Sequence, residues 1–340
     1  LAAALRHWSE YHADGKCLEV EMNQIELPKS VLDILRPAFE ESRIKRVCFD
    51  SHRRNRDMAG FAKKVLQTNH FVTKLGFGAI KFAQEDVETL CDAIKLRNAE
   101  GQFIKYLALA NCFEHGIDTH TLKMILTSIA SGSATAVVVL DLRSNGMSSR
   151  EAAVIAEFLN SNPCQTQLVL NGNRFDDADA ALLANALNNN THLKDIEVRE
   201  NGIKENGRLA FLRAIFDVSS LSSCAASNHT CSVDGLERDI SVLNSYKSAS
   251  VNKWSKIVAM LALSKEDSFI NISLLGGVPA QLIPVILDKL NNVGCVHDIH
   301  ELTDICLELT NATRCQKHDV WDGLGEMRSL NCMYNLMRSW

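Results

Sequence analysis

The sequence has no apolar run that is long enough to cross a membrane. Its two longest runs, VVVL from Val137 and IVAMLAL from Ile257, are far shorter than the roughly 20 apolar residues that span a bilayer. It also has no large excess of charge of one sign, because the formal net charge is −5 over 340 residues. No overall field attracts nucleic acid or an anionic membrane, and we expect neither a membrane span nor a nucleic-acid partner.

The cysteines form no pair with the spacing C-x-x-C. The 11 cysteines are scattered singly, and their odd number does not suggest a complete disulfide framework. This usage favours reduced and mostly buried thiols. Because the sequence as given also begins without a basic and apolar leader, we expect a cytoplasmic, reducing location.

Sequence motifs of catalysis are missing as well. There is no G-x-S-x-G, no phosphate-binding P-loop, no G-x-G-x-x-G and no H-E-x-x-H. The segment GFGAIKF from Gly76 lacks the third glycine of a dinucleotide site and the helix start that should follow it. We therefore expect no enzymatic activity and no cofactor.

One cluster near the C-terminus contains residue types that bind zinc: Cys295, His297, His300 and Cys306. Its spacing, C-x-H-x2-H-x5-C, is not a usual pattern of structural zinc sites, and most of it would lie on a single helix. We interpret these residues as surface histidines and buried thiols, and we expect no metal.

Six basic residues fall within the stretch SRIKRVCFDSHRRNRD, between Arg43 and Arg56. Such a stretch could attract phosphate groups. However, two acidic residues lie within it, no aromatic residues alternate with the basic ones, and a predicted strand divides it. We therefore interpret the stretch as a solvated surface.

What the sequence does contain is a repeat. Apolar residues lie three and five positions before an asparagine in two similar segments, which start at Val137 and Gln167. The same spacing recurs eight times at intervals of 27 to 33 residues, at the anchor positions Asn23, His52, Ile80, Cys112, Asn145, Asn173, Asn201 and Asn228. The apolar pairs predict short strands with one buried face, at Leu18/Val20, Val47/Phe49, Leu75/Phe77, Leu107/Leu109, Leu140/Leu142, Leu168/Leu170 and Ile196/Val198.

The asparagine at the anchor has a physical role. A turn that points its backbone into the core has N–H and C=O groups that water does not reach, and these groups must be paired. An asparagine amide both donates and accepts hydrogen bonds. We therefore predict a structural ladder formed by Asn23, Cys112, Asn145, Asn173, Asn201 and Asn228.

After each anchor the apolar spacing changes to that of a helix. Apolar pairs four residues apart share one helical face, at Leu90/Ile94, Ile155/Leu159, Leu183/Leu187 and Phe211/Ile215. Each repeat is thus predicted as strand, turn and helix. The strands should be parallel, because each helix must cross back before the next strand begins.

The pattern resembles the leucine-rich repeat, in which cysteine can replace the asparagine, as at Cys112. The 28-residue period and the long helical half NRFDDADAALLANALNNNT resemble the ribonuclease-inhibitor-like subfamily. The resemblance covers roughly residues 14–235, is strongest over 135–216, and weakens where His52 and Ile80 stand at the anchor. It implies an α/β fold, a leucine-rich repeat solenoid or horseshoe with a parallel concave sheet and convex helices.

We predict three regions along the chain. Residues 1–13 form an N-terminal capping segment, residues 14–235 form about eight repeats, and residues 236–340 form a mainly helical C-terminal capping region. A Ser-rich stretch from Asp217 to Val251 marks the end of regular stacking. A cap is expected because a terminal repeat must cover its open edge, although the same region could instead carry an effector domain.

The side chains that alternate outward on the strands should line the concave face as two rows. The predicted rows are Glu21, Asp50, Gly78, Ala110, Arg143, Asn171 and Arg199, and Glu19, Cys48, Gly76, Ala108, Asp141, Val169 and Glu197. Such a face is acidic at its start, shallow at the glycines and alanines, and mixed in charge at its end. The donors Arg143, Asn171 and Arg199 could bind a partner's carboxylate or amide groups. Alternatively, Arg143 pairs with Asp141 or Glu197 and the face is only solvated.

These features favour a non-enzymatic interaction scaffold or adaptor that binds a protein partner through its concave face. The alternative is the ligand-sensing half of a larger receptor-like polypeptide, which the resemblance to nucleotide-binding receptors with leucine-rich repeats allows. A GTPase-activating protein of the Ran-directed type also resembles this family, but this chain has fewer repeats and no long acidic tail. The partner's identity and the oligomeric state do not follow from the sequence.

Overall fold

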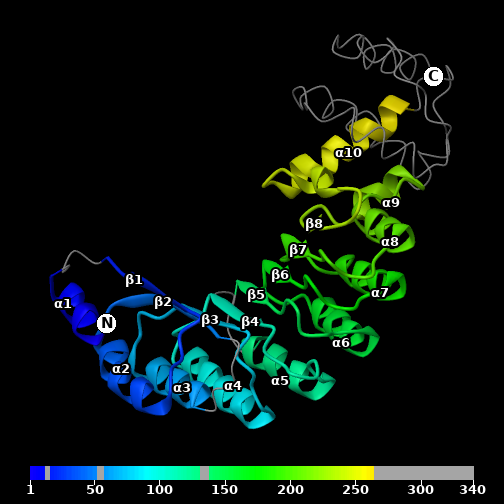
Figure 1. Cartoon of the computed structure of the whole chain (residues 1–340). Coiled ribbons are helices and arrows are strands. Elements are labelled where there is room, and N and C mark those ends of the chain that lie inside the picture. The colour runs from blue at the N-terminus through cyan, green and yellow to red at the C-terminus, as the bar shows by residue number, and fades with distance from the viewer. Residues whose placement is uncertain (12–15, 52–56, 131–137, 264–340) are drawn as a thin grey trace, which may run out of the picture.

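The computed structural model describes residues 1–11, 16–51, 57–130 and 138–263, which form a curved stack of strand and helix units (Figure 1). Eight strands lie in this part of the chain: β1 Leu18–Asn23, β2 Ile44–Asp50, β3 Lys74–Gly78, β4 Tyr106–Ala110, β5 Val139–Asp141, β6 Gln167–Val169, β7 Asp195–Glu197 and β8 Ser232–Asp234. They form one open parallel sheet in chain order. The predicted α/β solenoid is therefore confirmed.

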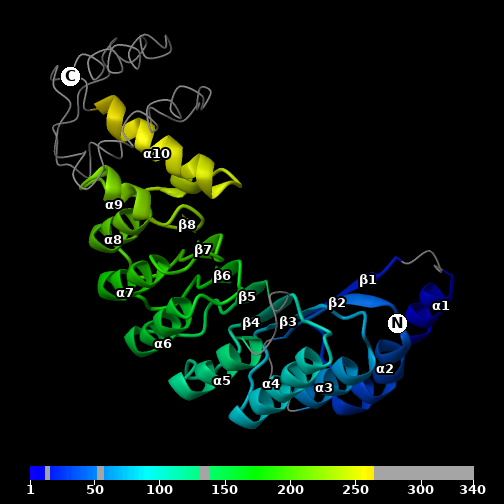
Figure 2. The same cartoon turned by 180° about the vertical axis from the view of Figure 1, so that it is seen from behind.

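Helices cover the outer side of the curve, and the sheet lines its inner side (Figures 1 and 2). One helix follows each of the first seven strands: α2 Lys29–Glu41, α3 Met58–Thr68, α4 Gln84–Ala99, α5 Thr119–Ala130, α6 Ser149–Asn160, α7 Asp177–Leu187 and α8 Glu205–Ile215. A further helix, α1 (Ala2–Tyr11), precedes β1 and packs against α2. Within the described ranges, no helix combines the length and apolarity needed to cross a bilayer.

Local signals in the sequence start these helices. At α7, the Asp176 side chain accepts hydrogen bonds from the N–H groups of Ala178 and Asp179. In return, the Asp179 carboxylate accepts one from the N–H of Asp176. This reciprocal capping satisfies N–H groups that have no partner inside the first turn, so the helix begins directly after the turn of its repeat.

The core consists of the inward pairs of the strands and the inner faces of the helices. The pairs predicted from Val47/Phe49 to Ile196/Val198 are all buried, with no residue more than 2% exposed. The four predicted helix pairs are buried to the same extent. In the N-terminal half the core also contains a chain of ring contacts, with centroids 5.1–6.3 Å apart, formed by Phe39, Phe49, Phe61, Phe77 and Phe82.

The first strand lies two residues away from its predicted register. Asn23 pairs with Asp50, and the buried residues of β1 are Val20 and Met22 rather than Leu18 and Val20. Asn23 is therefore exposed on the strand and does not belong to the ladder. The prediction was wrong because apolar residues alternate with polar ones over the whole segment LEVEMN, and a pattern of period two fits equally well after a shift of two residues.

Three asparagines form the ladder in the C-terminal half. The Asn145 side chain accepts from the N–H of Cys112 at 2.9 Å and donates to the carbonyl groups of Leu109 and Leu142 at 2.6 and 3.0 Å. The Asn173 side chain accepts from the N–H groups of Asn145 and Met147. Asn201 repeats the arrangement by accepting from the N–H of Phe175. Each amide thus links its own turn to the turn of the preceding repeat.

The ladder changes its chemistry toward the N-terminus. The Cys112 thiol donates weakly to the carbonyl groups of Phe77 and Ala110, at 3.4 Å in both cases. Burial raises the pKa of this thiol, so it keeps the proton that it donates. One repeat earlier, Ile80 is fully buried, and its side chain has no hydrogen-bond donor. The next anchor, His52, lies outside the described residues.

A second asparagine ladder runs along the loops that join each helix to the next strand. In this ladder Asn69, Asn190 and Asn228 each donate to a carbonyl near the end of the preceding repeat's helix, at Phe39, Leu159 and Leu187. Each also accepts from the N–H two residues later. Asn228 was predicted for the turn ladder, but the structure places it here. The error arose because both ladders need the same amide chemistry.

The last repeat is longer than the others because it contains an additional helix, α9 (Leu221–Ala226), between α8 and β8. A short 3₁₀ helix, η1 (Ser241–Asn244), follows β8, and α10 (Ala249–Leu263) packs against both α9 and η1. The 3₁₀ helix η1 thus contacts β8, the last strand of the described part of the sheet, and α10 packs on it from outside. Residues 264–340 lie outside the described part of the chain.

A buried lysine attaches α10 to the repeats. Lys256 is 0% exposed, and its ammonium group donates to the carbonyl groups of Ile215 and Asn228 and to the side-chain oxygen of Asn244, at 2.5, 3.2 and 2.6 Å. Its nitrogen also lies 3.4 Å from Nδ1 of His229. Burial lowers the pKa of Lys256 to about 7, and burial, followed by the charge of Lys256, lowers that of His229 to about 4.

Replacing Asn145 with alanine should test the turn ladder. Three hydrogen bonds to buried backbone groups are lost, so we expect the free energy of unfolding to fall by about 3 kcal/mol. Asn23→Ala is the matched control, because the Asn23 side chain is exposed and makes no hydrogen bond to a described residue. This control should change stability by less than about 0.5 kcal/mol. Urea denaturation followed by circular dichroism measures both, and equal effects would contradict the ladder.

The Lys256 cluster should make stability depend on pH. The unfolded chain protonates lysine near 10.5, whereas burial lowers the folded pKa to about 7. Between these values the unfolded state binds more protons, so stability rises with pH, by up to about 1.4 kcal/mol per unit. We expect Lys256→Met to remove most of this slope between pH 7 and 8, below the titration of ordinary thiols near about 8.5. Lys253→Met, on the same helix, should keep it, and an unchanged slope in Lys256→Met would show that another group causes it.

Candidate functional site

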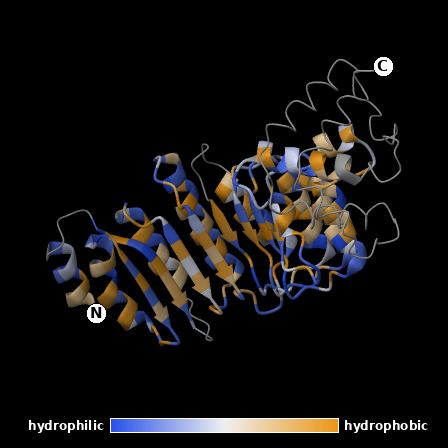
Figure 3. Cartoon of the chain, turned by 90° about the horizontal axis from the view of Figure 1, so that it is seen from above, coloured by the Kyte–Doolittle hydropathy of each residue, from blue (hydrophilic) through white to orange (hydrophobic). Residues whose placement is uncertain are grey.

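The inner side of the sheet carries two rows of side chains that cross all eight strands. The strand register gives the first row as Glu19, Arg46, Lys74, Tyr106, Val139, Gln167, Asp195 and Ser232. It gives the second row as Glu21, Cys48, Gly76, Ala108, Asp141, Val169, Glu197 and Asp234. Figure 3 shows the alternation of hydrophilic and hydrophobic residues along these strands.

From Cys48 to Glu197 the second row is the one predicted from the sequence. Because β1 is shifted, Glu21 lies beside Cys48 instead of Asp50, and Glu19 lies beside Arg46 instead of Cys48. The first row lies two residues nearer the strand starts and was missed, although the same alternation extended by one step would have found it. The other predicted residues lie at the ends of the strands or directly after them: Asp50, Gly78, Ala110, Arg143, Asn171 and Arg199.

The start of the face is a set of exposed ion pairs. Arg46 lies 3.0 Å from Glu21 and 3.6 Å from Glu19, and Lys74 lies 3.2 Å from Glu19. The hydrogen bond from Lys74 lowers the pKa of Glu19. All four side chains are 31–47% exposed, so these pairs contribute little to stability and can exchange partners. The acidic start predicted from Glu19 and Glu21 is thus neutralised by the strands beside it.

The predicted shallow floor is partly covered by its neighbours. A Cβ atom added at Gly76 would lie 2.8 Å from the sulfur of Cys48, and one added at Gly78 would lie 3.0 Å from the Asp50 carboxylate. The glycines therefore make room for side chains of β2 rather than for a partner. Ala110 is half-buried at the end of β4 and leaves the centre of the face open. Burial raises the pKa of Cys48, so this thiol stays protonated at neutral pH.

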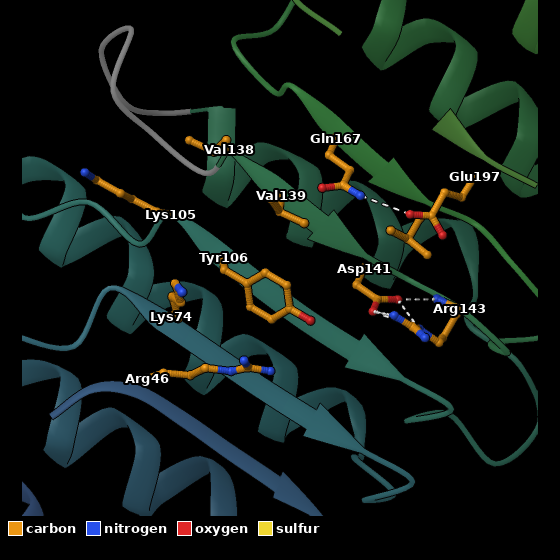
Figure 4. A pocket seen from close by; sticks show the side chains of 11 residues that line it. Arg46, Lys74, Lys105, Tyr106, Val138, Val139, Asp141, Arg143, Gln167 and Glu197 are labelled. Atoms are coloured by element: carbon orange, nitrogen blue, oxygen red, sulfur yellow. Dashed lines mark hydrogen bonds and ion pairs between the residues drawn. The ribbon is translucent and has the colours of Figure 1, made fainter. Parts of the chain in front are cut away.

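The hollow of the face lies farther along the stack, over β4 to β6, with a volume of about 420 Å³ (Figure 4). Its floor is the ring of Tyr106, which lies beside Val139, and its lining is completed by Arg46, Lys74, Lys105, Val138, Asp141, Arg143, Gln167, Val169 and Glu197. The Arg46 guanidinium lies 5.7 Å from the Tyr106 ring centre, within range of a cation–π contact. Burial and the nearby Asp141 raise the pKa of Tyr106, so its hydroxyl remains a neutral donor and acceptor.

A buried acid and its arginine form one wall of the hollow. The Asp141 side chain is 3% exposed, and Arg143 reaches both of its oxygens, with Nε at 2.9 and 2.8 Å. The backbone N–H of Arg143 donates to the same carboxylate at 3.1 Å. The hydrogen bond to Asp141 raises the pKa of Arg143. The sequence left two possibilities for Arg143, a donor for a partner or a pair with a neighbouring acid. In the structure Arg143 pairs with Asp141.

The other two predicted donors are also engaged. Asn171 donates to Glu197 at 2.8 Å and accepts from the N–H of Arg199 at 2.7 Å. The Arg199 side chain pairs with Asp234, which does not belong to either of the predicted rows. Beside them, burial and then the charge of Glu197 raise the pKa of Asp195. This end of the face has more acid than base, with Asp195, Glu197 and Asp234 around one arginine.

The basic stretch between Arg43 and Arg56 does not present a single surface. Arg43 lies 5.7 Å from the centre of the Phe71 ring, whereas Arg46 faces the hollow. The three arginines from Arg53 to Arg56 lie outside the described residues. Among residues 1–11, 16–51, 57–130 and 138–263, no group of three histidine, cysteine or acidic side chains could hold a metal ion. The cluster from Cys295 to Cys306 falls outside these ranges.

Comparison with known proteins gives no family. No protein-family model matches the chain, and no curated protein sequence matches it. Among solved structures, the actin-binding site 2 of leiomodin-1 is similar with a TM-score of 0.36 at 14% identity, over 53% of this chain and 95% of that chain. A protein from Bacteroides fragilis is similar with a TM-score of 0.29 at 13% identity, over 61% of this chain and 78% of that chain. Similarity at this level carries no functional argument.

Replacing Arg143 with glutamine should destabilise the protein by about 2 kcal/mol, because the buried Asp141 carboxylate loses its cation. The effect stays below that of a fully buried pair since Arg143 is half-exposed. The double variant Asp141→Asn with Arg143→Gln should recover most of the loss. Arg199→Gln is the matched control and should change stability by less than about 0.5 kcal/mol, because its partner Asp234 is exposed. Urea denaturation measures the stability of each variant, and similar losses of stability in Arg143→Gln and Arg199→Gln would contradict this prediction.

Proposed function

We propose that this chain is a non-enzymatic interaction scaffold that binds a protein partner through the concave face over β3 to β7. The supporting observation is the hollow at Tyr106, which brings an apolar floor together with polar groups that have no partner in the described structure. Among the described residues, Lys105 has no ion-pair partner and the Tyr106 hydroxyl has no hydrogen-bond partner. A surface with an apolar centre and a polar rim is typical of protein interfaces.

We further propose that the chain belongs among the leucine-rich repeats of the ribonuclease-inhibitor-like type. The 28-residue spacing from Asn145 to Asn173 and to Asn201, together with one long helix per repeat, supports this assignment. The remainder of the face fits an interaction surface better than a catalytic one. Its acids Asp141 and Glu197 are hydrogen-bonded, and its half-buried thiol, Cys48, has a raised pKa.

We infer a reducing, cytoplasmic location from the thiols. The described cysteines are all free, and burial raises the pKa of Cys224 to about 12. The pKa values of Cys112 and Cys231 are raised by burial as well. Buried thiols of this kind are part of the packed core and need no oxidising environment to fold.

Blocking the concave face should remove the partner. Ala110→Trp places a large side chain on the concave face at the end of β4 without breaking any ion pair. Leu182→Trp is the matched control, since Leu182 is 44% exposed on α7, on the outer side. We expect affinity capture from a lysate of the source cells, read by mass spectrometry, to recover a partner with the native chain and with Leu182→Trp. Ala110→Trp should lose it at least about tenfold, as expected for a residue within an interface.

Circular dichroism and thermal denaturation would first establish that both tryptophan variants are folded. A partner that is captured equally by all three proteins would rule out the concave face and move attention to the outer helices. A partner lost only by Leu182→Trp would have the same consequence.

A further inference from the structure

The hollow at Tyr106 has an excess of positive charge on one side. Arg46 on β2, Lys74 at the start of β3 and Lys105 directly before β4 line the same hollow (Figure 4). The acids that reach them, Glu19 and Glu21, lie at the far edge of the sheet and are 46% and 47% exposed. A carboxylate arriving here would meet Lys105, which has no acidic partner in the part of the chain that the structure describes, and two cations whose present pairs are weak.

The centre of the hollow is apolar. Tyr106 is half-buried and lines the hollow with its ring, and Val138, Val139 and Val169 extend the apolar surface across the next two strands. A bulky side chain placed on this surface would bury apolar area, and the hydroxyl could donate to an acceptor beside it. The adjoining Asp141 is already paired with Arg143, so it does not repel an incoming acid as a free carboxylate would.

The opposite side of the hollow has an acidic character. Glu197 lines it and is held by the amide groups of Gln167 and Asn171, which are neutral donors. The charges of Arg143 and Arg199 also act on Glu197, but both arginines are hydrogen-bonded to other carboxylates, those of Asp141 and Asp234. Asp195 precedes it on the same strand, and its raised pKa has the charge of Glu197 as its second cause after burial. A basic side chain is the natural complement of this side.

The geometry points to a specific class of partner: an extended protein segment that carries an acidic residue, then a bulky apolar residue, then a basic residue. This inference rests on the proposed function of the concave face and names the chemistry of its ligand. Neighbouring strands lie about 4.8 Å apart, so the path from Lys74 on β3 to Glu197 on β7 is about 19 Å. An extended chain covers it with about six residues, at about 3.3 Å each. The acidic and apolar residues would lie about two positions apart, because β3 and β4 are neighbours, and the basic residue about four positions farther on, because β7 lies three strands from β4.

Selection from a library of random dodecapeptides displayed on phage tests this inference directly. The full chain is immobilised, and the enriched peptides are synthesised with a fluorescent label and titrated by fluorescence anisotropy. We expect enriched sequences to combine acidic, large apolar and basic residues in this order, read in either chain direction. Their affinity should fall as the salt concentration rises, because the cations involved are exposed.

Variants of the hollow supply the control. Lys105→Glu reverses the charge of a lysine that has no ion pair in the described part of the chain, and it should weaken the selected peptides by about tenfold or more. Lys64→Glu makes the same charge change at an exposed position of α3 on the outer side and should leave affinity unchanged. Tyr106→Phe keeps the ring and removes only the hydroxyl, so we expect a loss of about fivefold.

Enriched peptides without acidic residues, equal binding to Lys105→Glu and the native chain, or no enrichment at all would each overturn the inference. The proposed function can be judged separately with Ala110→Trp. If this variant loses a captured partner while Lys105→Glu keeps it, the concave face binds a protein, but not by the charge pattern inferred here.

Discussion

The fold depends on pairing backbone groups that the repeat turns inward. A solenoid has to turn its chain sharply twice in every repeat, once after the strand and once after the helix, and both turns expose N–H and C=O groups to a core without water. Asn145 and Asn173 solve the problem at the first turn, and Asn190 and Asn228 solve it at the second. Since each amide also binds the preceding repeat, the same hydrogen bonds that satisfy one turn fix the spacing of the stack.

The N-terminal half meets this constraint in a different way. Where Cys112 and Ile80 stand at the anchor, side-chain pairing weakens and then disappears, and phenylalanine rings pack along the core instead. Phe49 and Phe77 stack across neighbouring strands with centroids 6.1 Å apart. Apolar packing is not directional, so this half can vary its turns more than the asparagine half can. The repeat is therefore more regular in sequence after residue 135, where Asn145, Asn173 and Asn201 stand at the anchors.

Most of the fold could be predicted from the sequence, because burial imposes a strict pattern on every repeat. The failures occurred where two arrangements satisfy the same pattern. In β1 the alternation of Leu18, Val20 and Met22 fits two registers, and Asn228 has the chemistry of either ladder. Less of the candidate site could be predicted. Spacing shows which side chains face outward, but the covering of Gly76 by Cys48 depends on side-chain positions that no spacing contains.

The charges of the concave face bear more on selectivity than on stability. Arg46, Lys74 and Arg199 are each paired, yet each pair is exposed, and an exposed pair stabilises a fold little. A ligand that binds at such a surface replaces the acid of an existing ion pair with its own. If its charge is wrongly placed, both the displaced acid of the face and the charged group of the ligand lack a partner. The Asp141 and Arg143 pair differs because its acid is buried and must keep its arginine. This pair therefore acts as a fixed wall, whereas the exposed charges on both sides of it are free to exchange partners.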